Sequence, residues 1–455
     1  MSELPKGWGK STLGEICSKP QYGYTTKADP NNGSVKFLRT TDITKGRLDW
    51  DTVPFCMEAP SDLNKYQLVV GDIVIARSGS VGVSYLIDKS YEPAVFASYL
   101  IRFKPITPVL SRYVKAFLDS HLFWEQVEIN KAGNALQNIN AQKLSAISLP
   151  LAPLAEQKRI VAKLDEVLAQ VDTIKARLDR IPAILKRFRQ SVLAAAVSGK
   201  LTEEWRGRKQ IQEAWREVTL KDLTLSISDG DHQAPPKAES GVPFLVISNV
   251  SSGFIDFQKV TRWVPKEYFG SLKDVRVPKK GDLLYTVTGS FGIPVKVDTD
   301  TNFCFQRHIA IIKVNREIVS GDFLYYWLLS PIAFMQAEST ATGTAQKTVS
   351  LTSLRNFDFN LPRLEEQTEI VRLVDQYFAF ADTIEAQVKK AQARVDNLTQ
   401  SILAKAFRGE LVAQDPNDEP AEKLLERIAK ARSEAEQLAK AAKKAVKAGR
   451  KTRIN

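Results

Sequence analysis

The sequence has few of the residues from which metal centres, disulfide frameworks and nucleophilic active sites are usually built. Among 455 residues there are three cysteines and three histidines. Three scattered cysteines cannot form a disulfide framework, so we expect reduced thiols in a cytoplasmic protein. Cys304 and His308 have the spacing of half a zinc site, but no second ligand pair lies near them in the sequence. Packing is therefore the expected role of both residues, and no metal site is predicted.

Several catalytic and membrane signatures are also missing. No Asn/Asp/Ser-Pro-Pro-Tyr/Phe tetrapeptide of an amino-methyltransferase occurs, and the only Pro-Pro pair is followed by Lys237. Gly199-Lys200 lacks the upstream glycine and the following Ser or Thr of a phosphate-binding loop. No apolar run approaches the roughly 18 residues of a membrane span, and no signal peptide is recognisable. We expect a soluble intracellular chain with no catalytic residues, no cofactor and no membrane partner.

Positive charge is present but unevenly distributed. The formal net charge is +12, yet residues 420–455 alone contain 11 Lys/Arg and 4 Glu, which leaves about +5 for the remainder. Charge therefore gives only weak support for nucleic-acid binding. The Ala-, Lys- and Glu-rich residues 421–447 predict an exposed helix. Its sequence leaves open whether this helix is merely solvated or is a basic arm that touches phosphate or an acidic partner.

One long stretch occurs twice in the chain. Residues 154–201 and 364–411 align without a gap at an offset of 210 residues, with 19 identities among 48 pairs. Chance predicts about one identity in twenty, so the stretch is an internal duplication. Its apolar residues recur at alternating steps of four and three, which is typical of a coiled coil. We predict two long helices that pair with each other, each roughly 70 Å long at 1.5 Å per residue.

The predicted interface of the helix pair follows from the same periodicity. Pro182 lies inside the first copy, where it should kink or break the helix, whereas the second copy has Gln392 there. The alternative is that each helix is only a core helix of its own globular domain. The predicted interface residues are Ile160, Leu164, Val171, Ile174 and Leu178 in the first copy and Ile370, Val374, Ile384, Val388 and Val395 in the second.

Two globular regions precede the two copies and repeat one order of short motifs. Both open on Trp…Thr-Leu, at Trp8 and Trp215, and both contain Gly-Asp and Gly-Ser turns ahead of strand-like runs. Elsewhere the two regions differ almost everywhere, which favours two modules of one kind with different targets over simple drift. We divide the chain into globular domains 1–150 and 207–362, long helices 151–206 and 363–412, and a linker with a basic tail, 413–455.

Four motifs occur in duplicate and in the same order. Besides the Trp…Thr-Leu openings and the Gly-Ser turns, these are Leu-Pro…Glu-Gln-x-x-Ile-Val at 149–161 and 361–371 and the closing segments 191–201 and 401–411. In this arrangement the chain resembles the specificity subunit of type I restriction-modification enzymes over nearly its whole length. It departs from that pattern in a first Leu-Pro…Glu-Gln junction two residues longer than the second, and in a longer Lys-rich extension after Pro420.

The resemblance implies an α+β fold with two duplicated mixed α/β target recognition domains, separated by two long helices that pair as an antiparallel coiled coil with pseudo-twofold symmetry. Each domain would read one half of a split, asymmetric site on double-stranded DNA, and the helix pair would set the unread spacer. Two copies of a DNA methyltransferase subunit, which would bind S-adenosylmethionine, are the implied partners, with a motor-nuclease subunit as a further one. The bases read and the spacer length stay open.

Candidate DNA contacts are polar side chains on loops that occur in both domains. Asn and Gln can bond adenine, and Arg can bond guanine, through two hydrogen bonds in the major groove. Any one of them can equally be an ordinary loop residue. The candidates are Tyr22, Tyr24, Thr25, Lys27, Arg77, Ser78, Ser80, Asn134, Gln137 and Asn138 in the first domain, and Asp231, His232, Gln233, Thr286, Thr288, Ser290, Arg307, Thr344, Gln346 and Lys347 in the second.

Other interpretations of the same features stay open. The Glu-Gln pairs at 156–157 and 366–367 lie where the helices begin, so we expect their carboxylates to favour the positive end of the helix dipole, ahead of contact with a methyltransferase subunit. The whole chain could instead be a coiled-coil scaffold carrying two protein-binding domains, whose binding would be insensitive to DNA. An enzyme with an unrecognised site is a third hypothesis.

Overall fold

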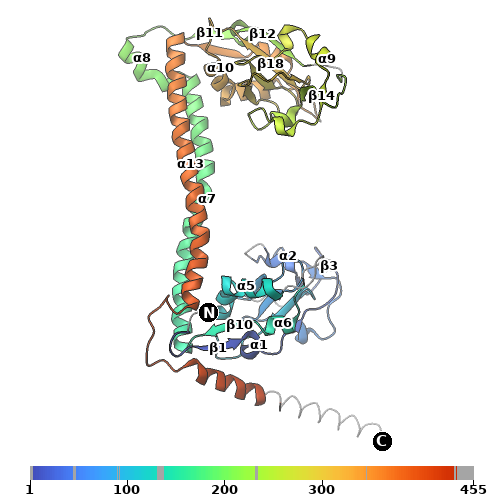
Figure 1. The fold of residues 1–455 in the computed structure, drawn as a ribbon, viewed down its shortest axis with the longest axis vertical. Helices are drawn as coiled ribbons and strands as arrows, with labels where there is room; N and C mark the ends of the chain where they lie inside the picture. The colour runs from blue at the N-terminus through green and yellow to red at the C-terminus, as the bar shows by residue number, and fades with distance from the viewer. Residues whose placement is uncertain are drawn as a thin grey trace. The chain divides into compact units, whose positions relative to one another are not determined.

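The chain folds into two compact units. The computed structural model describes residues 4–44, 48–89, 91, 93–130, 138–230, 234–344, 346–434 and 437. The first unit comprises Met1–Leu178 and Ala391–Asn455, and the second comprises Asp179–Lys390. Each unit contains one globular domain together with part of each long helix (Figure 1). The predicted fold class, two duplicated α+β domains with two long helices, is confirmed.

The globular domain of the first unit is built on two small four-stranded sheets. One is antiparallel in the order β2-β9-β6-β7, and the other, β3-β5-β4-β8, has a parallel pair β4-β8. Strand β6 is apolar and fully buried because its sheet is covered on both faces. The strands are β1 (Gly9–Thr12), β2 (Gln21–Tyr22), β3 (Ala28–Asp29), β4 (Lys36–Leu38), β5 (Phe55–Cys56), β6 (Ile73–Ala76), β7 (Ser84–Leu86), β8 (Ala94–Phe96), β9 (Leu100–Phe103) and β10 (Ser148–Leu151), and the helices are α1 (Leu13–Ile16), α2 (Thr40–Ile43), α3 (Leu63–Tyr66), α4 (Ser111–Leu118), α5 (His121–Asn130) and α6 (Ala141–Ser145).

The globular domain of the second unit repeats this topology. Its four-stranded sheet has the order β12-β18-β15-β16, and a three-stranded sheet, β14-β13-β17, again contains one parallel pair. In both domains the first and last strands, β1-β10 and β11-β19, form a separate antiparallel pair. The strands are β11 (Arg216–Thr219), β12 (Thr224–Asp229), β13 (Val242–Leu245), β14 (Trp263–Val264), β15 (Leu283–Thr286), β16 (Pro294–Lys296), β17 (Cys304–Phe305), β18 (Ile309–Val314) and β19 (Asp358–Leu361), and the α-helices are α8 (Glu203–Lys209), α9 (Lys266–Gly270), α10 (Gly321–Leu328), α11 (Pro331–Thr340) and α12 (Leu351–Arg355).

The two long helices are α7 (Leu154–Val197) and α13 (Leu364–Phe407), of 44 residues each. In the first unit, Lys175 of α7 lies 2.7 Å from Asp396, while Leu164 shares a buried cluster with Leu403. Residue numbers therefore rise along α7 as they fall along α13. In the second unit the same order holds, since Arg189 lies 2.6 Å from Asp382 and Val197 shares a buried cluster with Ile370. The antiparallel pairing that the resemblance implied is confirmed within each unit.

The predicted interface of the helix pair is buried over part of its length. Ile160, Leu164 and Val171 are buried in the first unit, and Ile370, Val374 and Val388 in the second, whereas Leu178, Ile384 and Val395 are half-buried. Ile174 is instead 44% exposed. Helix α7 continues through Pro182 without a break. Pro182 is exposed, so the carbonyl group that loses its helical donor can be solvated.

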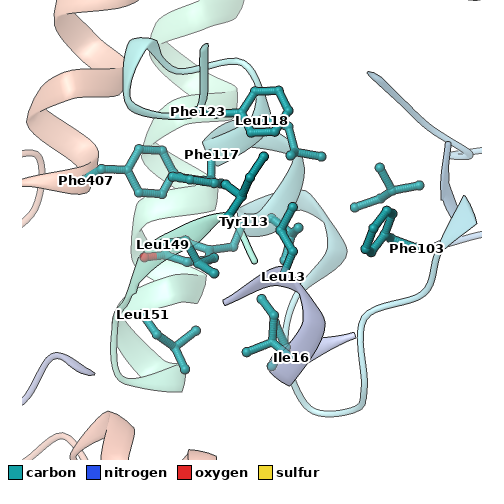
Figure 2. Packing of buried hydrophobic residues seen from close by; sticks show 14 of the residues in the cluster. Leu13, Ile16, Phe103, Tyr113, Phe117, Leu118, Phe123, Leu149, Leu151 and Phe407 are labelled. Carbon is teal, nitrogen blue, oxygen red and sulfur yellow. The ribbon is translucent and has the colours of Figure 1, made fainter. Parts of the chain in front are cut away.

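Each long helix ends inside a globular core. Phe407, the last residue of α13, packs against Tyr113 and Phe117 of α4, with ring centroids 5.3 and 5.6 Å apart (Figure 2). In the second unit, Val192 and Val197 near the end of α7 are buried in the cluster that contains the core of that domain. Each domain is thus held by the beginning of the helix that follows it and by the end of the other long helix.

A C-terminal helix lies on the first domain. Residues 421–434 are helical, and Ala421, Leu424 and Ile428 are buried in the core cluster of the first unit. The Ala421 N–H donates to the Gly7 carbonyl at 2.8 Å, and the Arg432 guanidinium donates to the Gly14 carbonyl at 2.5 Å. This part of the predicted exposed helix is therefore docked. Of the residues beyond this helix, only Gln437 is described, so all the basic residues of the tail after it lie outside the described residues.

Candidate nucleic-acid interface

The turn between β6 and β7 is the centre of the polar loop cluster in the first domain. Gly79 and Gly82 have φ values of 73° and 93°, which favour glycine, and the Gly82 N–H closes the turn on the Ala76 carbonyl at 2.9 Å. Ser78 forms a β-bridge with Asn138, so the loop before α6 lies beside the turn. The structure thereby brings together three predicted residues, Ser78, Ser80 and Asn138, from two distant parts of the sequence.

Tyr22 and Arg77 form a pair next to this turn. The Arg77 guanidinium carbon lies 4.9 Å from the centroid of the Tyr22 ring, within the range of a cation–π contact. The Tyr22 hydroxyl accepts a hydrogen bond from the Ala141 N–H at 3.0 Å, which fixes the ring at the start of α6. Tyr22 is 40% exposed, so the pair lies at the surface.

A shallow pocket beside the turn contains residues that the sequence reasoning missed. It has a volume of about 300 Å³, and Thr40, Thr41 and Tyr99 line it together with Ser78 and Ser80. Tyr99 is 62% exposed. No motif marks these three residues, because α2 and the β8–β9 turn reach the pocket only through the sheet topology. The pocket offers hydrogen-bonding groups on an accessible surface.

The other candidates of the first domain lie apart from this turn or support the fold. Tyr24 is half-buried, packs on Tyr66 at 5.3 Å between centroids and joins β8 through its N–H bond to the Phe96 carbonyl. Thr25 and Lys27 are exposed. The Lys27 carbonyl accepts the Met57 N–H, which places it near β5. Asn134 and Gln137 lie outside the described residues.

In the second domain the equivalent turn lies between β15 and β16. Thr286 is fully buried, and its hydroxyl accepts the Ile293 N–H at 3.0 Å, so it stabilises the turn and we remove it from the candidate contacts. Thr288 is also buried and accepts a hydrogen bond from the Thr348 hydroxyl at 3.3 Å. Only Ser290 of the three predicted residues in this turn is exposed. Position in the motif therefore did not predict side-chain direction.

A second loop lies against this turn. Thr344, Gln346 and Lys347 are exposed, and the Lys347 carbonyl accepts the Gly289 N–H at 3.0 Å. Arg307 is exposed on the loop between β17 and β18. Burial, and then the charge of Arg307, lower the pKa of the neighbouring His308, which therefore favours its neutral form. Asp231, His232 and Gln233 lie outside the described residues.

The Glu-Gln pairs lock each domain to its long helix. The Trp8 indole donates to Glu156 at 2.9 Å, and the Trp215 indole donates to Glu366 at 3.0 Å. The neighbouring glutamines also match, since each donates its side-chain amide to the carbonyl five residues before it, Gln157 at 2.8 Å and Gln367 at 2.9 Å. All four side chains are buried, so they join domain and helix besides lying at the helix start. Both partners of this lock were visible as repeated motifs, but their contact was not.

The two locks differ in their remaining contacts. Glu366 also accepts hydrogen bonds from Thr202 and Arg206, both at 2.6 Å. One buried oxygen of Glu156 has no partner among the residues that the structure describes, and Arg159 next to it pairs with Asp418 instead. Burial, as the largest cause, raises the pKa of Glu156, and the charge of Asp418 adds to that rise.

Metal ligands do not gather in the part of the chain that the structure describes: no group of three or more His, Cys, Asp or Glu side chains is placed to hold an ion. Cys304 is buried, with its thiol 3.8 Å from the Pro243 carbonyl. Across the described helices, none has the length and apolar character needed to cross a lipid bilayer.

Two like domains, each with a polar loop cluster and each locked to both long helices, define a bipartite recognition protein. A family model for the type I restriction modification DNA specificity domain matches residues 5–183 and again residues 212–392. The chain belongs to this family. It is 34% identical to the type I restriction enzyme EcoBI specificity subunit of Escherichia coli over 411 residues, covering 86% of this chain and 84% of that protein. It is also 34% identical to the EcoKI specificity subunit of Escherichia coli K12, covering 90% and 91%.

Solved structures share the fold. A chain from a structure of a type I restriction-modification system, described for its complex assembly and conformational transition, matches with a TM-score of 0.65 and 22% identity over 90% of this chain and all of that one. The HsdS subunit from Thermoanaerobacter tengcongensis matches with a TM-score of 0.57 and 21% identity, covering 90% and 98%.

Proposed function

We propose that the two domains read the two unlike halves of a split target on double-stranded DNA, which is how this specificity subunit would direct its restriction-modification complex. The observation that carries the proposal is the contrast between frame and surface. Both domains close their Gly-Ser turns with the same backbone hydrogen bonds, yet the side chains around them differ. A shared frame with different polar loops suits two different base sequences.

The contacts fall into two kinds by chemistry. Exposed hydroxyl groups and glycine amides at the turns, such as Ser80 and Ser290, suit phosphate and would set the register of each domain on the duplex. Side chains with two bonding groups, such as Arg77 in the first domain and Gln346 in the second, suit base edges. Lys27, Arg307 and Lys347 add exposed positive charge for the phosphate backbone.

Partner subunits supply the chemistry in this proposal. The relatives are named as subunits of type I restriction enzymes, and the lock of domain to helix occurs twice in this chain. A frame of domain and helix that is present in duplicate suits two copies of one partner, for which we propose a DNA methyltransferase subunit that binds S-adenosylmethionine. A motor-nuclease subunit would join the complex to cleave. The continuous α7 and α13 would set the number of unread base pairs between the half-sites.

A methylome experiment tests the proposal. The gene is expressed with its methyltransferase partner in a host without other adenine methylation, and the genome is sequenced by long reads that detect modified bases. We expect one asymmetric motif, in two parts separated by a fixed gap, that vanishes when this gene is omitted. Methylation that does not depend on this gene would contradict the proposal, and partner binding unaffected by DNA would favour a protein scaffold.

A further inference from the structure

The position of Arg77 is part of the frame that both domains share. Its N–H donates to the Tyr99 carbonyl at 2.9 Å, and its own carbonyl accepts the Ile139 N–H at 3.0 Å. In the second domain Val287 occupies the equivalent place, with bonds of 2.9 Å to the His308 carbonyl and 2.8 Å from the Val349 N–H. The backbone is therefore held on both sides in each domain, and only the side chain differs.

The two side chains have opposite environments. Val287 is buried in the core cluster of its unit. Arg77 is half-buried, and its guanidinium lies over the exposed face of Tyr22. Because the Tyr22 hydroxyl is bonded to the Ala141 N–H, the ring cannot swing away without losing that bond. The Tyr22 ring thus holds the guanidinium beside the β6–β7 turn.

Arg77 has no counter-charge within the described ranges. It forms no ion pair there, and its Nε atom is enclosed without an acceptor. The neighbouring strand shows how this fold treats a structural arginine: Arg102 on β9 lies 3.2 Å from Asp72 and donates to Gln21 at 2.5 Å. A buried guanidinium N–H without an acceptor is unfavourable unless a shift of the side chain or a ligand supplies one.

We propose that Arg77 reads a guanine in the half-site bound by the first domain, and that the second domain makes no equivalent contact. The inference rests on the proposed function. Guanine presents two acceptors, O6 and N7, on one edge in the major groove, and the guanidinium fork matches both. The adjacent turn already offers groups for phosphate: Gly79 faces open space and Ser80 is exposed. The planar, oriented cation is therefore assigned to the base.

Methylome sequencing of two variants in the complete complex tests the assignment. Arg77→Lys keeps the charge and loses the fork, and Arg77→Gln loses both. In Arg77→Gln we expect discrimination at one G·C pair of the first half-site to fall about 5- to 150-fold, because a bidentate contact is worth roughly 1–3 kcal/mol. In Arg77→Lys we expect a smaller fall, because lysine can still donate to guanine O6 and N7. The second half-site should be unchanged. Arg112→Gln, which removes an exposed arginine of the same domain, is the control expected to keep the motif.

A base analogue tests the same contact without a folding risk. Replacing guanine by 7-deazaguanine removes the N7 acceptor. In a competition assay with the complete complex, the analogue should weaken the wild type at one position of the first half-site and leave Arg77→Gln unaffected. Three outcomes overturn the inference: no G·C pair in that half-site, an unchanged motif in both variants, or a uniform loss of affinity at all sites, which indicates a phosphate contact. A wild type without any split motif would instead refute the proposed function.

Discussion

At the scale of single residues, the two buried glutamates of the repeated Glu-Gln motif differ in the hydrogen bonds that they accept. Glu366 accepts hydrogen bonds from Trp215, Thr202 and Arg206, whereas one buried oxygen of Glu156 has no partner in the described part of the chain. We expect Glu366→Gln to lower the free energy of unfolding of the second unit by about 2 kcal/mol, because it weakens bonds to a charged acceptor. Glu156→Gln should cost less in the first unit. Differential scanning calorimetry of both variants checks the order.

Glu156 also predicts how the stability of the first unit depends on pH. The pKa of Glu156 is raised by burial, so its carboxyl group binds a proton more tightly in the folded state than in the unfolded chain. The contribution of Glu156 to stability is therefore fully present below the unfolded pKa and is lost as pH rises through the folded pKa. Glu156→Gln should remove this loss. Equal pH profiles for the variant and the wild type would contradict the prediction.

The direction of single side chains is also what the sequence predicted least well. Thr286 and Ser290 belong to one repeated turn, yet the first is buried and the second exposed. That difference depends on which face of β15 meets the sheet, and the motif carries no such information. Thr40 and Tyr99 reach the first domain's pocket through the tertiary fold alone. The loop positions could therefore be predicted, and the direction of each side chain could not.

At the scale of elements, α13 contributes to a core far away in the sequence. Phe407 packs between Tyr113 and Phe117 (Figure 2). We expect Phe407→Ala to destabilise the first unit by about 3–5 kcal/mol through a cavity in that core. Hydrogen exchange of α4 measures the effect. Leu398→Ala, at a site 45% exposed on the same helix, is the control and should change little. Unaltered α4 protection in Phe407→Ala would show that the contact contributes little.

The long helices were the most predictable elements, and the reason is physical. Their apolar period of alternating four and three residues persists along both copies, so the periodicity defines the helix and its buried face. It contains no information about what each end meets. The insertion of Phe407 into the first domain and the Trp–Glu locks could not be read from it. Of the kink or break expected at Pro182, the break does not occur, since α7 continues through this exposed site.

At the scale of the whole molecule, the described part of the C-terminal tail is structural. Helix 421–434 buries Ala421, Leu424 and Ile428 on the first unit. A chain truncated after residue 412 should lose about 4 kcal/mol of stability in that unit, from the burial of two large aliphatic side chains. A chain truncated after Gln437 keeps this helix and loses seven Lys and Arg residues, so its unfolding should match the wild type. Equal loss in both truncations would assign the effect to the basic residues instead.

The duplicated Trp–Glu lock also bears on how such genes can change. Because Trp8 and Trp215 meet equivalent glutamates in the same geometry, a foreign domain that carries this tryptophan could be seated on either long helix. Crossover between the two repeated coding segments would then exchange whole domains while keeping the Trp–Glu contact. New target sequences would arise by exchange of intact modules, without a series of point mutations that each had to fold.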